Sequence, residues 1–281
     1  MTLCVSDAVR IDTQRHSQRG GNELSAPRRT LTTMAGTRPR TSARTAVVWE
    51  VLRDALTELG TDRPVNIVDA GGGSGGFAVP LAELGHHVVV VDPSPDSLAA
   101  LERRAAEAGA EARIRAIQGD AAGLLDVVAA GSVDLVLCHS VLEVVDDPAE
   151  ALTAVARVLR PAGLASILVA NRVAAVVARA AAGRLGEARR LLDDPAGTSG
   201  DGDPLARRFD LDELSAAVVG VGLEPRLAHG VRVFADVVAP ALVDGDPDAE
   251  RELLALEHAA ARRPDYLSVA TQLHLLAANP G

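Results

Sequence analysis

Lysine is absent from this chain of 281 residues, and all 28 basic residues are arginine. The absence excludes chemistry that needs a lysine amine, namely Schiff-base catalysis and the phosphate-binding lysine of a P-loop. Cysteine is almost as scarce, because Cys4 and Cys138 are the two that occur. Two cysteines make neither a disulfide framework nor a CxxC metal site, so we expect a reducing, cytoplasmic location and no bound metal.

Long apolar runs, an excess of positive charge and aromatic residues are also missing. The apolar runs fall far short of the roughly 20 residues that cross a bilayer, so we expect no membrane segment. A net charge of −10 argues against general affinity for nucleic acid, and aromatic residues, which would stack on an extruded base, make up 2% of the chain. The 48% apolar content suffices for the core of a folded, soluble protein.

The first 38 residues differ in composition from the rest. They are rich in Thr, Ser, Arg and Gly and show no helical or strand period, which predicts a disordered arm at 1–38 and a single domain at 39–281. Met34 lies where the arm ends, and our hypothesis is that translation starts there. The intact mass of the native protein would test it.

Between residues 46 and 170, short apolar runs alternate with helical patterns. Apolar residues recur at three and four over 46–59, which predicts an amphipathic helix. Because single helices separate the apolar runs that follow, we expect a parallel, doubly wound α/β sheet. The expected strands are 65–69, 88–92, 114–118, 133–138 and 164–170, and the expected helices are 77–84, 97–108 and 148–159.

The rhythm changes after residue 171. Residues 172–208 form an excursion that we expect to be helical at first and then, over 193–204, a flexible acidic loop that could act as a lid. Asp210, with Glu213 three residues later, predicts a capped helix over 210–219. Two further strands at 226–234 and 268–277, with a helix at 248–262 between them, complete the expected fold.

The stretch "VDAGGGSGGF" places glycines between an expected strand and an expected helix. Such a turn lets backbone N–H groups and a helix N-terminus approach a nucleotide-type ligand. Gly71 and Gly73 fit GxGxxG if Gly76 is the third glycine, and GxGxG if it is Gly75. Both patterns stay open, and either could also be a plain glycine-rich loop.

Two aspartates accompany this turn. Asp92 closes the next strand, where a carboxylate can accept both hydroxyls of a ribose; alternatively it is a turn residue before Pro93. Asp69 lies within the first strand, two residues before Gly71. We expect it to brace the glycine turn through backbone hydrogen bonds or to meet a cationic group of the ligand.

A series of motifs then runs in order from about residue 40 to 171: "IVDAGGGSG", "VVVVDPSPDSL", "IQGDA", "VDLVLCHSVLEVVDDP" and "VLRPAGLASILVAN". This series resembles the class I S-adenosylmethionine-dependent methyltransferases. The resemblance implies a Rossmann-like sheet of seven strands with an antiparallel last strand and an insertion after strand five. One departure is Ala162, where "LRPGG" is commoner; because Gly163 remains for the turn, we expect little cost.

The resemblance also implies S-adenosylmethionine as cofactor and assigns roles residue by residue. Gly71, Gly73 and Gly75 would line its amino-acid end, while Asp92 would bind its ribose. Asp120 and Ala121 would lie beside the adenine, and His139 would face the methyl-transfer region.

Segments outside these motifs are similar to the family of tRNA 5-carboxymethoxyuridine methyltransferases. They are "RTAVVW" at 44–49, "HGVRVFAD" at 229–236 and "ALEHAAARRPDYLSVATQLHLLA" at 255–277, besides "VLEVVDDP". This resemblance implies a methyl ester formed on a tRNA carboxylate, with Arg44 on the carboxylate of the cofactor. A small-molecule acceptor is the alternative.

A carboxylate acceptor makes physical sense, because an anion that attacks a sulfonium methyl group needs orientation and a dry pocket but no general base. Arg232 could clamp the acceptor, or it could form an ordinary salt bridge. His139, four residues before Glu143, could take a proton from another kind of acceptor if the two share a helix face, or it could simply pack over the cofactor. Tyr266 could line the acceptor pocket or cap the core.

Some features disagree with a tRNA substrate. Residues 191–213 hold seven acids against Arg207 and Arg208, which is a poor composition for phosphate binding. Four arginines on the preceding helix could compensate or could form an ordinary solvated face: Arg179, Arg184, Arg189 and Arg190. Two other classes of function stay open, an NAD-dependent oxidoreductase built on GxGxxG and a non-catalytic methyltransferase-like scaffold.

Overall fold

The structure is a computed structural model that describes residues 42–60 and 63–281. All of these residues fall in one compact unit. The expected arm at 1–38, the hypothetical start at Met34 and Cys4 lie outside the described residues.

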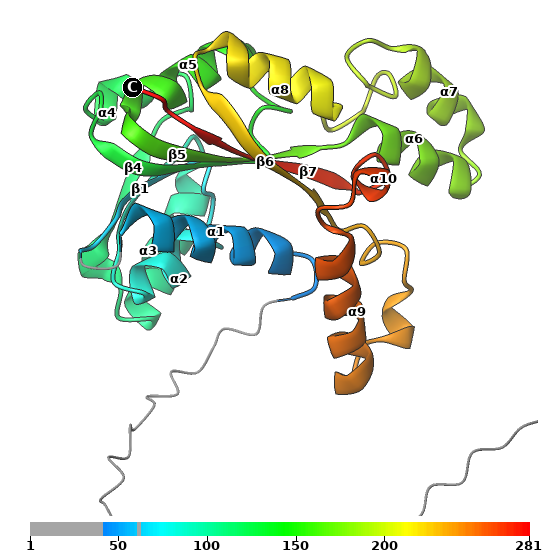
Figure 1. The fold of residues 1–281 in the computed structure, drawn as a ribbon, viewed down its shortest axis with the longest axis horizontal. Coiled ribbons are helices and arrows are strands. Elements are labelled where there is room, and N and C mark those ends of the chain that lie inside the picture. The colour runs from blue at the N-terminus through cyan, green and yellow to red at the C-terminus, as the bar shows by residue number, and fades with distance from the viewer. Residues whose placement is uncertain (1–41, 61–62) are drawn as a thin grey trace, which may run out of the picture. The chain divides into compact units, whose positions relative to one another are not determined.

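A seven-stranded sheet forms the centre of the described residues, in the order β3-β2-β1-β4-β5-β7-β6 (Figure 1). Strand β7 pairs antiparallel with both β5 and β6, and the other neighbours pair in parallel. The expected α/β class and the antiparallel last strand are therefore confirmed. The strands are β1 Asn66–Ala70, β2 His87–Asp92, β3 Ile114–Gln118, β4 Val133–His139, β5 Leu159–Ala170, β6 Glu224–Val231 and β7 Gln272–Ala278.

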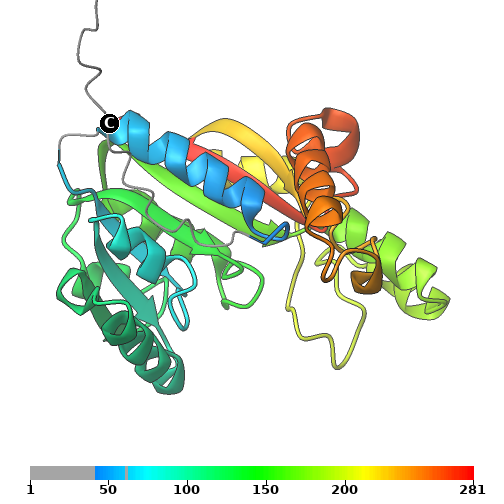
Figure 2. The same ribbon diagram turned by 90° about the horizontal axis from the view of Figure 1, so that it is seen from below.

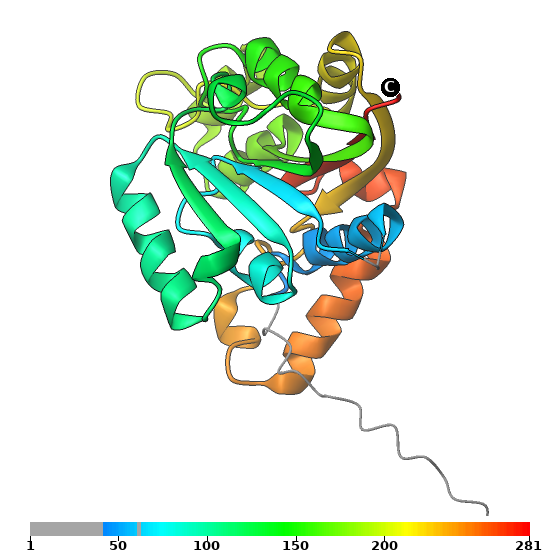
Figure 3. The ribbon, with the colours of Figure 1, turned by 90° about the vertical axis from the view of Figure 1, so that its left-hand side faces the viewer.

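Helices cover both faces of the sheet (Figures 1 and 3). Helices α1, α2 and α3 pack on one face, and α4, α5 and α8 on the other. Helix α9 lies beside the end at which α1 begins (Figure 2). The helices are α1 Ala46–Leu59, α2 Ala78–Glu83, α3 Pro95–Glu107, α4 Leu124–Val127, α5 Pro148–Val158, α6 Arg172–Ala181, α7 Leu185–Asp193, α8 Leu211–Gly220, α9 Pro247–Ala260 and α10 Pro264–Leu267, with short 3-10 turns at Glu111–Arg113 and Pro240–Leu242.

Strand β4 shows why the central strands read as continuous apolar runs. Leu135 and Leu137 enter the core beneath α1, whereas Val136 and Cys138 enter the core on the opposite face, and all four are fully buried. A strand that is covered on both faces needs apolar side chains at every position. The carboxyl ends of β1, β2, β4 and β5 meet at one edge of the sheet, where α/β proteins place their ligands.

The structure corrects three expectations about the later part of the chain. The excursion begins as two helices, α6 and α7, separated at Gly183, whose φ is 75°. The last strand starts at Gln272 and not at 268, because Pro264 opens the short helix α10 first. Strand β5 starts at Leu159, five residues before the expected 164, because Leu159 already pairs with Val133.

The "LRPAG" turn also differs from expectation. Ala162, with a φ of 61°, occupies the left-handed region, whereas Gly163 provides space: a Cβ there would lie 2.9 Å from the carbonyl oxygen of Arg160. A left-handed conformation costs a non-glycine residue about 1–2 kcal/mol. We expected alanine at position 162 to cost little because Gly163 remains for the turn, and this expectation is wrong, since Ala162 itself has the left-handed conformation.

Candidate active site

The glycine turn joins β1 to α2, and its geometry decides between the two glycine patterns. Gly71, Gly73 and Gly75 have φ values of 72°, 55° and 80°, in the region that favours glycine. A Cβ on Gly75 would lie 2.3 Å from Leu101 Cδ1, whereas a Cβ on Gly76 would meet nothing within 4 Å. The requirement for glycine thus follows GxGxG.

Asp92 ties the glycine turn to the end of β2. One carboxylate oxygen accepts the N–H of Gly73 at 2.9 Å, and the other accepts the N–H of Ser94 at 2.9 Å. The side chain is 7% exposed. Each carboxylate oxygen can accept a second hydrogen bond. Asp92 is therefore a turn residue that could also hold a pair of ribose hydroxyls.

Asp69 is a buried acid beneath the same turn. A Cβ on Gly72 would lie 2.6 Å from the Asp69 carboxylate carbon, so only glycine fits above it. Burial, and secondly the charge of Asp92, raise the pKa of Asp69 to about 7. A cation beside Asp69 would stabilise its ionised form. This environment suits the second of the two roles expected for Asp69, contact with a cationic ligand group.

Asp120 and Ala121 follow β3 at the same edge of the sheet. Asp120 is exposed, and its carboxylate accepts the N–H of Gly123 at 2.7 Å. Ala121 is 3% exposed and packs in the core, so it could meet a ligand only with its backbone.

His139 ends β4 and is held by its neighbours. Its Nε2 lies 2.8 Å from Ser166 Oγ, and its ring makes an edge contact with Phe77 at 4.9 Å between centroids. Burial lowers the pKa of His139 to about 3, so the ring is neutral at physiological pH. The Nδ1 atom is buried and has no hydrogen-bond partner among the described residues.

His139 and Glu143 would share a helix face only if the segment after β4 were helical, and residues 140–147 form turns and bends instead. Glu143 is 1% exposed, and its Oε1 accepts the N–H of Ala170 at 2.6 Å. Burial raises the pKa of Glu143. The carboxyl group thus holds the turn against the end of β5.

Arg44 and Arg232, which come from distant parts of the sequence, meet at one carboxylate. Arg44 Nη2 lies 3.1 Å from one oxygen of Asp236, and Arg232 Nη2 lies 2.6 Å from the other. Two guanidinium groups and one carboxylate leave a net charge of +1. We call these three residues the arginine cluster. Arg232 directly follows β6, so the cluster lies at the same edge of the sheet as the glycine turn.

Glu257 on α9 shapes the segment that carries Arg232. Its carboxylate accepts the N–H groups of Val233, Phe234 and Ala235 at 3.0, 2.9 and 2.7 Å, and the residue is fully buried. Arg232 has a φ of 60°, which is rare for a residue other than glycine. Tyr266 packs on Phe234 at 5.8 Å between ring centroids, so it joins the same segment. The three backbone hydrogen bonds thus maintain a strained Arg232.

Comparison with known proteins decides the family. The Methyltransferase domain family model matches residues 68–167. Over 250 residues the chain is 30% identical to the tRNA 5-carboxymethoxyuridine methyltransferase of Escherichia coli K12, covering 84% of this chain and 88% of that protein. The chain belongs to the class I S-adenosylmethionine-dependent methyltransferases. S-adenosylmethionine is therefore its cofactor, and the oxidoreductase and scaffold readings are wrong.

Other similar proteins agree with this family. The methyltransferase is 34% identical over 166 residues to a ubiquinone biosynthesis O-methyltransferase from Caulobacter sp. K31, covering 59% of this chain and 61% of that one. Its fold matches a methyltransferase from Methanosarcina mazei with a TM-score of 0.55 and 17% identity, covering 82% and 96% of the two chains. It also matches the [4+2]-cyclase SpnF, with a TM-score of 0.54, 20% identity, and 82% and 81% coverage. The structural matches show the fold alone.

The turn at the end of β1 fits this cofactor. Glycines leave its backbone bare, Asp92 offers acceptors for hydroxyls, and Asp69 offers a partner for an ammonium group. Arg44 has donors left over for a carboxylate, because a guanidinium has five N–H groups and one nitrogen contacts Asp236. The assignment of each residue to its part of the cofactor stays a prediction.

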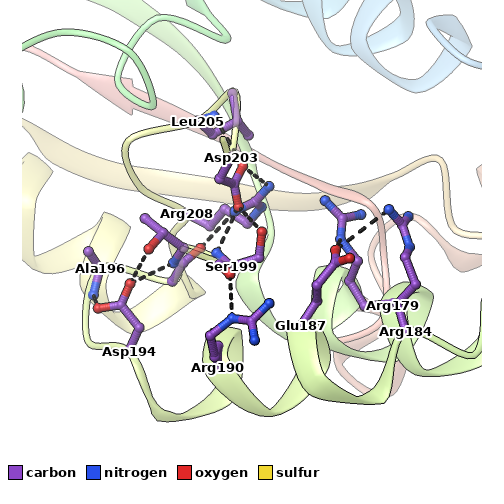
Figure 4. Close-up of polar contacts among 12 residues, drawn as sticks. Arg179, Arg184, Glu187, Arg190, Asp194, Ala196, Ser199, Asp203, Leu205 and Arg208 are labelled. Atoms are coloured by element: carbon purple, nitrogen blue, oxygen red, sulfur yellow. Dashed lines mark hydrogen bonds and ion pairs between the residues drawn. The ribbon is translucent and has the colours of Figure 1, made fainter. Parts of the chain in front are cut away.

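The excursion of this methyltransferase is held by contacts within itself (Figure 4). Arg208 makes two hydrogen bonds to Asp203, at 2.8 and 2.9 Å, and Asp203 also accepts the N–H of Ser199 at 2.8 Å. Arg207 donates to the carbonyl oxygens of Leu142 and Asp146, among others. Loop 193–204 is therefore cross-linked by its own polar side chains, and its flexibility stays a prediction.

The arginines on α6 and α7 have partners too. Arg179 and Arg184 both approach Glu187, at 3.1 and 3.5 Å, and Arg190 donates to the carbonyl oxygen of Ser199 at 2.8 Å (Figure 4). In the part of the chain that the structure describes, no helix could span a membrane, and no three His, Cys, Asp or Glu side chains are placed so that they could hold a metal ion.

Sequence reasoning missed Asp236, Glu257 and Ser166. Glu257 had a weak signal, since it is an acid at a position where α9 otherwise faces the core. No sequence signal pointed to Asp236 or Ser166, because the tertiary fold brings their partners to them from distant parts of the sequence.

Proposed function

We propose that this methyltransferase transfers the methyl group to a carboxylate, that of 5-carboxymethoxyuridine in tRNA. The observation that carries the proposal is the arginine cluster: Asp236 holds Arg44 and Arg232 together at the carboxyl edge of the sheet. S-adenosylmethionine supplies a methyl group on a positively charged sulfur. The acceptor must then be oriented toward it.

The cluster can bind a further anion. Arg232 is 25% exposed, and its guanidinium offers donors besides the one at Asp236. A planar guanidinium matches the two oxygens of a carboxylate, and a charge-assisted hydrogen bond contributes about 1.5–3 kcal/mol. With the carboxylate of the cofactor on Arg44, Arg232 remains for the carboxylate of the acceptor.

The acceptor needs no base in this reaction. A carboxylate is ionised at neutral pH, and its attack on the methyl group cancels two opposite charges. His139 is neutral, so it adds no charge to the site. Its contribution is a hydrogen-bonding atom at the end of β4 and a ring that excludes water next to Phe77.

Support for tRNA comes from the relative that shares 30% identity over 250 residues. A small carboxylic acid is the second candidate, and the excursion favours it. Arg179, Arg184 and Arg190 contact groups of the excursion itself, so phosphate groups would have to compete for them. The two candidates share the chemistry of the bond and differ only in what carries the carboxylate.

Methyl-labelled S-adenosylmethionine would separate the candidates. The enzyme is incubated with total tRNA or, separately, with a metabolite extract, and the Asp92→Ala variant serves as the inactive control. Label in tRNA that mild alkali releases indicates an ester on the nucleoside. Alkali-labile label confined to small molecules supports the second candidate, and label that resists alkali in both pools contradicts carboxylate methylation.

A further inference from the structure

A buried chain of polar side chains crosses four neighbouring strands. His139 Nε2 on β4 lies 2.8 Å from Ser166 Oγ on β5, and Ser166 Oγ lies 2.8 Å from His274 Nε2 on β7. His274 Nδ1 then lies 3.3 Å from His229 Nδ1 on β6. We call these four residues the histidine relay. Side chains two positions apart on a strand share one face of the sheet. The residues two positions after Ser166, His274 and His229 are Leu168, Leu276 and Val231, and all three pack in the core beneath α1. The relay therefore lies on that face of the sheet.

The number of protons in the relay is fixed by its chemistry. Burial lowers the pKa of His139, His229 and His274, with Arg262 adding to the effect on His229, so each ring is neutral. A neutral imidazole carries one N–H and serine one O–H, which makes four protons. Three of them occupy the three hydrogen bonds, since each bond needs one. If both rings instead donated to Ser166, its buried O–H would have no acceptor among the described residues, and such buried donors are rare. The fourth proton therefore sits at one end, on His139 Nδ1 or on His229 Nε2.

Two arrangements of the relay follow. In the first, His139 and His229 both carry the proton on Nε2, and His274 carries it on Nδ1. In the second, all three rings have the opposite tautomer. His139 Nδ1 is a lone pair in the first arrangement and an N–H donor in the second. The tautomers of His139 and His229, on different strands, are therefore always the same.

The two ends of the relay lie in different surroundings. His139 ends β4 at the cofactor edge, and its Nδ1 is buried without a partner among the described residues. His229 lines a cavity of about 110 Å³ under α1. The charged and titratable groups that line the cavity with it are Glu50, Asp54 and Glu58 from α1, His258 from α9 and Arg262.

The charged groups that line the cavity favour one of the two arrangements of the relay over the other. Glu50 and Asp54 favour a proton on His229, and Arg262 opposes it. Glu50 is also paired with His258, and Glu58 with Arg226. Asp54 thus remains as a carboxylate that lines the same cavity as His229 and can accept an N–H from its Nε2, so we expect the first arrangement. His139 then presents a lone pair at the cofactor edge.

We propose that Ser166, His274 and His229 are positioning residues that set, from the cavity under α1, whether His139 Nδ1 accepts or donates a hydrogen bond at the methyl-transfer edge. Passing from the first arrangement to the second takes up one proton at His139 Nδ1 and releases one from His229 Nε2 into the cavity. Within the relay, each of the three bonded protons moves across its own hydrogen bond, so charge and protons balance. The inference requires a methyltransferase but no particular acceptor.

Nitrogen-15 NMR of the full-length protein labelled in histidine tests the relay without any substrate. The coupling patterns of Nδ1–H and Nε2–H rings differ, and single His→Gln variants assign the signals. We expect Nε2–H for His139 and His229 and Nδ1–H for His274. If His139 and His229 have opposite tautomers, or if His139 is a cation at pH 7, the relay is refuted.

Removing hydrogen bonds of the relay should lower kcat and leave the affinity for S-adenosylmethionine unchanged. Ser166→Ala removes both hydrogen bonds at Ser166 Oγ, and we expect kcat to fall about tenfold or more, the size of effect found for the partners that orient metal-bound histidines. The affinity for S-adenosylmethionine should stay within twofold. His229→Asn, at the far end, keeps a polar group near the Nδ1 position and should lower kcat too. Ser215→Ala, on α8 at the opposite face, is the matched control.

Using both variants distinguishes a loss of the relay from a loss of folding. If Ser166→Ala does not fold, His229→Asn still tests the connection, because its site is the cavity and not the cofactor edge. Unchanged kcat in a folded His229→Asn variant, together with an unchanged His139 signal, would overturn the proposal. A failure to label any carboxylate would contradict the proposed function alone and leave the tautomer result standing.

Discussion

The carboxylate of Asp92 accepts a hydrogen bond from the backbone N–H of Gly73 at 2.9 Å, which joins the end of β2 to the turn after β1. If Asp92 also holds the ribose, Asp92→Ala removes two charge-assisted hydrogen bonds to the cofactor. Each contributes about 1.5–3 kcal/mol, so the affinity for S-adenosylmethionine should fall at least ~100-fold.

Titration calorimetry measures this loss directly. Asp96→Ala, an exposed acid in the first turn of α3, is the matched control and should bind as the wild type does. Unchanged affinity in the Asp92→Ala variant would refute the ribose assignment and leave Asp92 as a turn residue.

Arg232→Ala should separate binding of the two substrates. The affinity for S-adenosylmethionine should persist, because Arg44 and Asp236 remain. Turnover of a carboxylate acceptor should fall about 100-fold, which corresponds to the loss of roughly 2–3 kcal/mol of charge-assisted hydrogen bonding. Steady-state kinetics with each substrate varied provides the measurement.

Arg226→Ala is the control for this variant, since Arg226 is an exposed arginine on β6 whose partner is Glu58. Turnover that survives the loss of Arg232 would mean that the residue forms only a salt bridge with Asp236.

The raised pKa of Asp69 predicts a dependence of cofactor binding on pH. Burial and the charge of Asp92 raise the pKa of Asp69 to about 7, above its usual value, so the folded protein holds a proton that the unfolded chain has lost. The contribution of Asp69 to stability is therefore present at low pH and declines as the pH rises from about 4 to 7. A cationic cofactor group beside Asp69 would reverse this trend by favouring the ionised form.

Binding of S-adenosylmethionine should then release a proton near pH 6.5. Calorimetry in buffers of different ionisation enthalpy would detect it, and affinity should rise with pH up to about 7. Asp69→Asn should abolish the release. Equal binding enthalpies in all buffers for the wild type would show that no ammonium group meets Asp69.

Much of the fold could be predicted from the sequence because it depends on local patterns. The expected helix at 46–59 coincides with α1, since its apolar residues recur at the helical period. The glycine turn and Asp92 were also found, because strand, glycines and acid follow one another within one stretch of chain. The break between α6 and α7 was missed, since Gly183 in a helical pattern is only a weak signal.

Contacts between distant strands could not be predicted in this way. The histidine relay requires that β7 pair antiparallel with β5 and β6, so that His274 lies between Ser166 and His229. A shift of one residue in either register would turn His274 to the other face. The meeting of Arg44 and Arg232 at Asp236 likewise depends on how α1 and the end of β6 pack.

Ala162→Gly should stabilise the protein. Ala162 has a φ of 61° and is exposed, so the left-handed strain of about 1–2 kcal/mol is removed and only the larger entropy of glycine opposes the gain. We expect a net gain of roughly 0.5–1 kcal/mol in the free energy of unfolding. Denaturation by urea should show it.

A glycine substitution in a helix is the matched control. Ala99 is exposed within α3, where glycine should cost about 1 kcal/mol. If both substitutions destabilise the protein alike, Ala162 is not strained.

The buried pair of Asp203 and Arg208 should keep the excursion folded. The two side chains are 2% and 6% exposed, and removing one charge of a buried pair costs about 3–5 kcal/mol because the other stays behind without its partner. Arg208→Met should therefore open residues 193–208 to proteolysis and hydrogen exchange, while the sheet stays protected. Arg189→Met, on the exposed surface of α7, should leave both measurements unchanged.

The effect of Arg208→Met should depend on pH. Burial alone would raise the pKa of Asp203, but the hydrogen bonds from Arg208 and Ser199 outweigh it and hold that pKa well below its usual range. Since the folded pKa is depressed, the stabilisation is present above about pH 4 and declines as the pH falls below it. The difference in loop protection between wild type and variant should shrink on acidification. A difference that stays constant down to pH 3 would show that Arg208 acts through packing and its bond to Gly197, and not through the charge of Asp203.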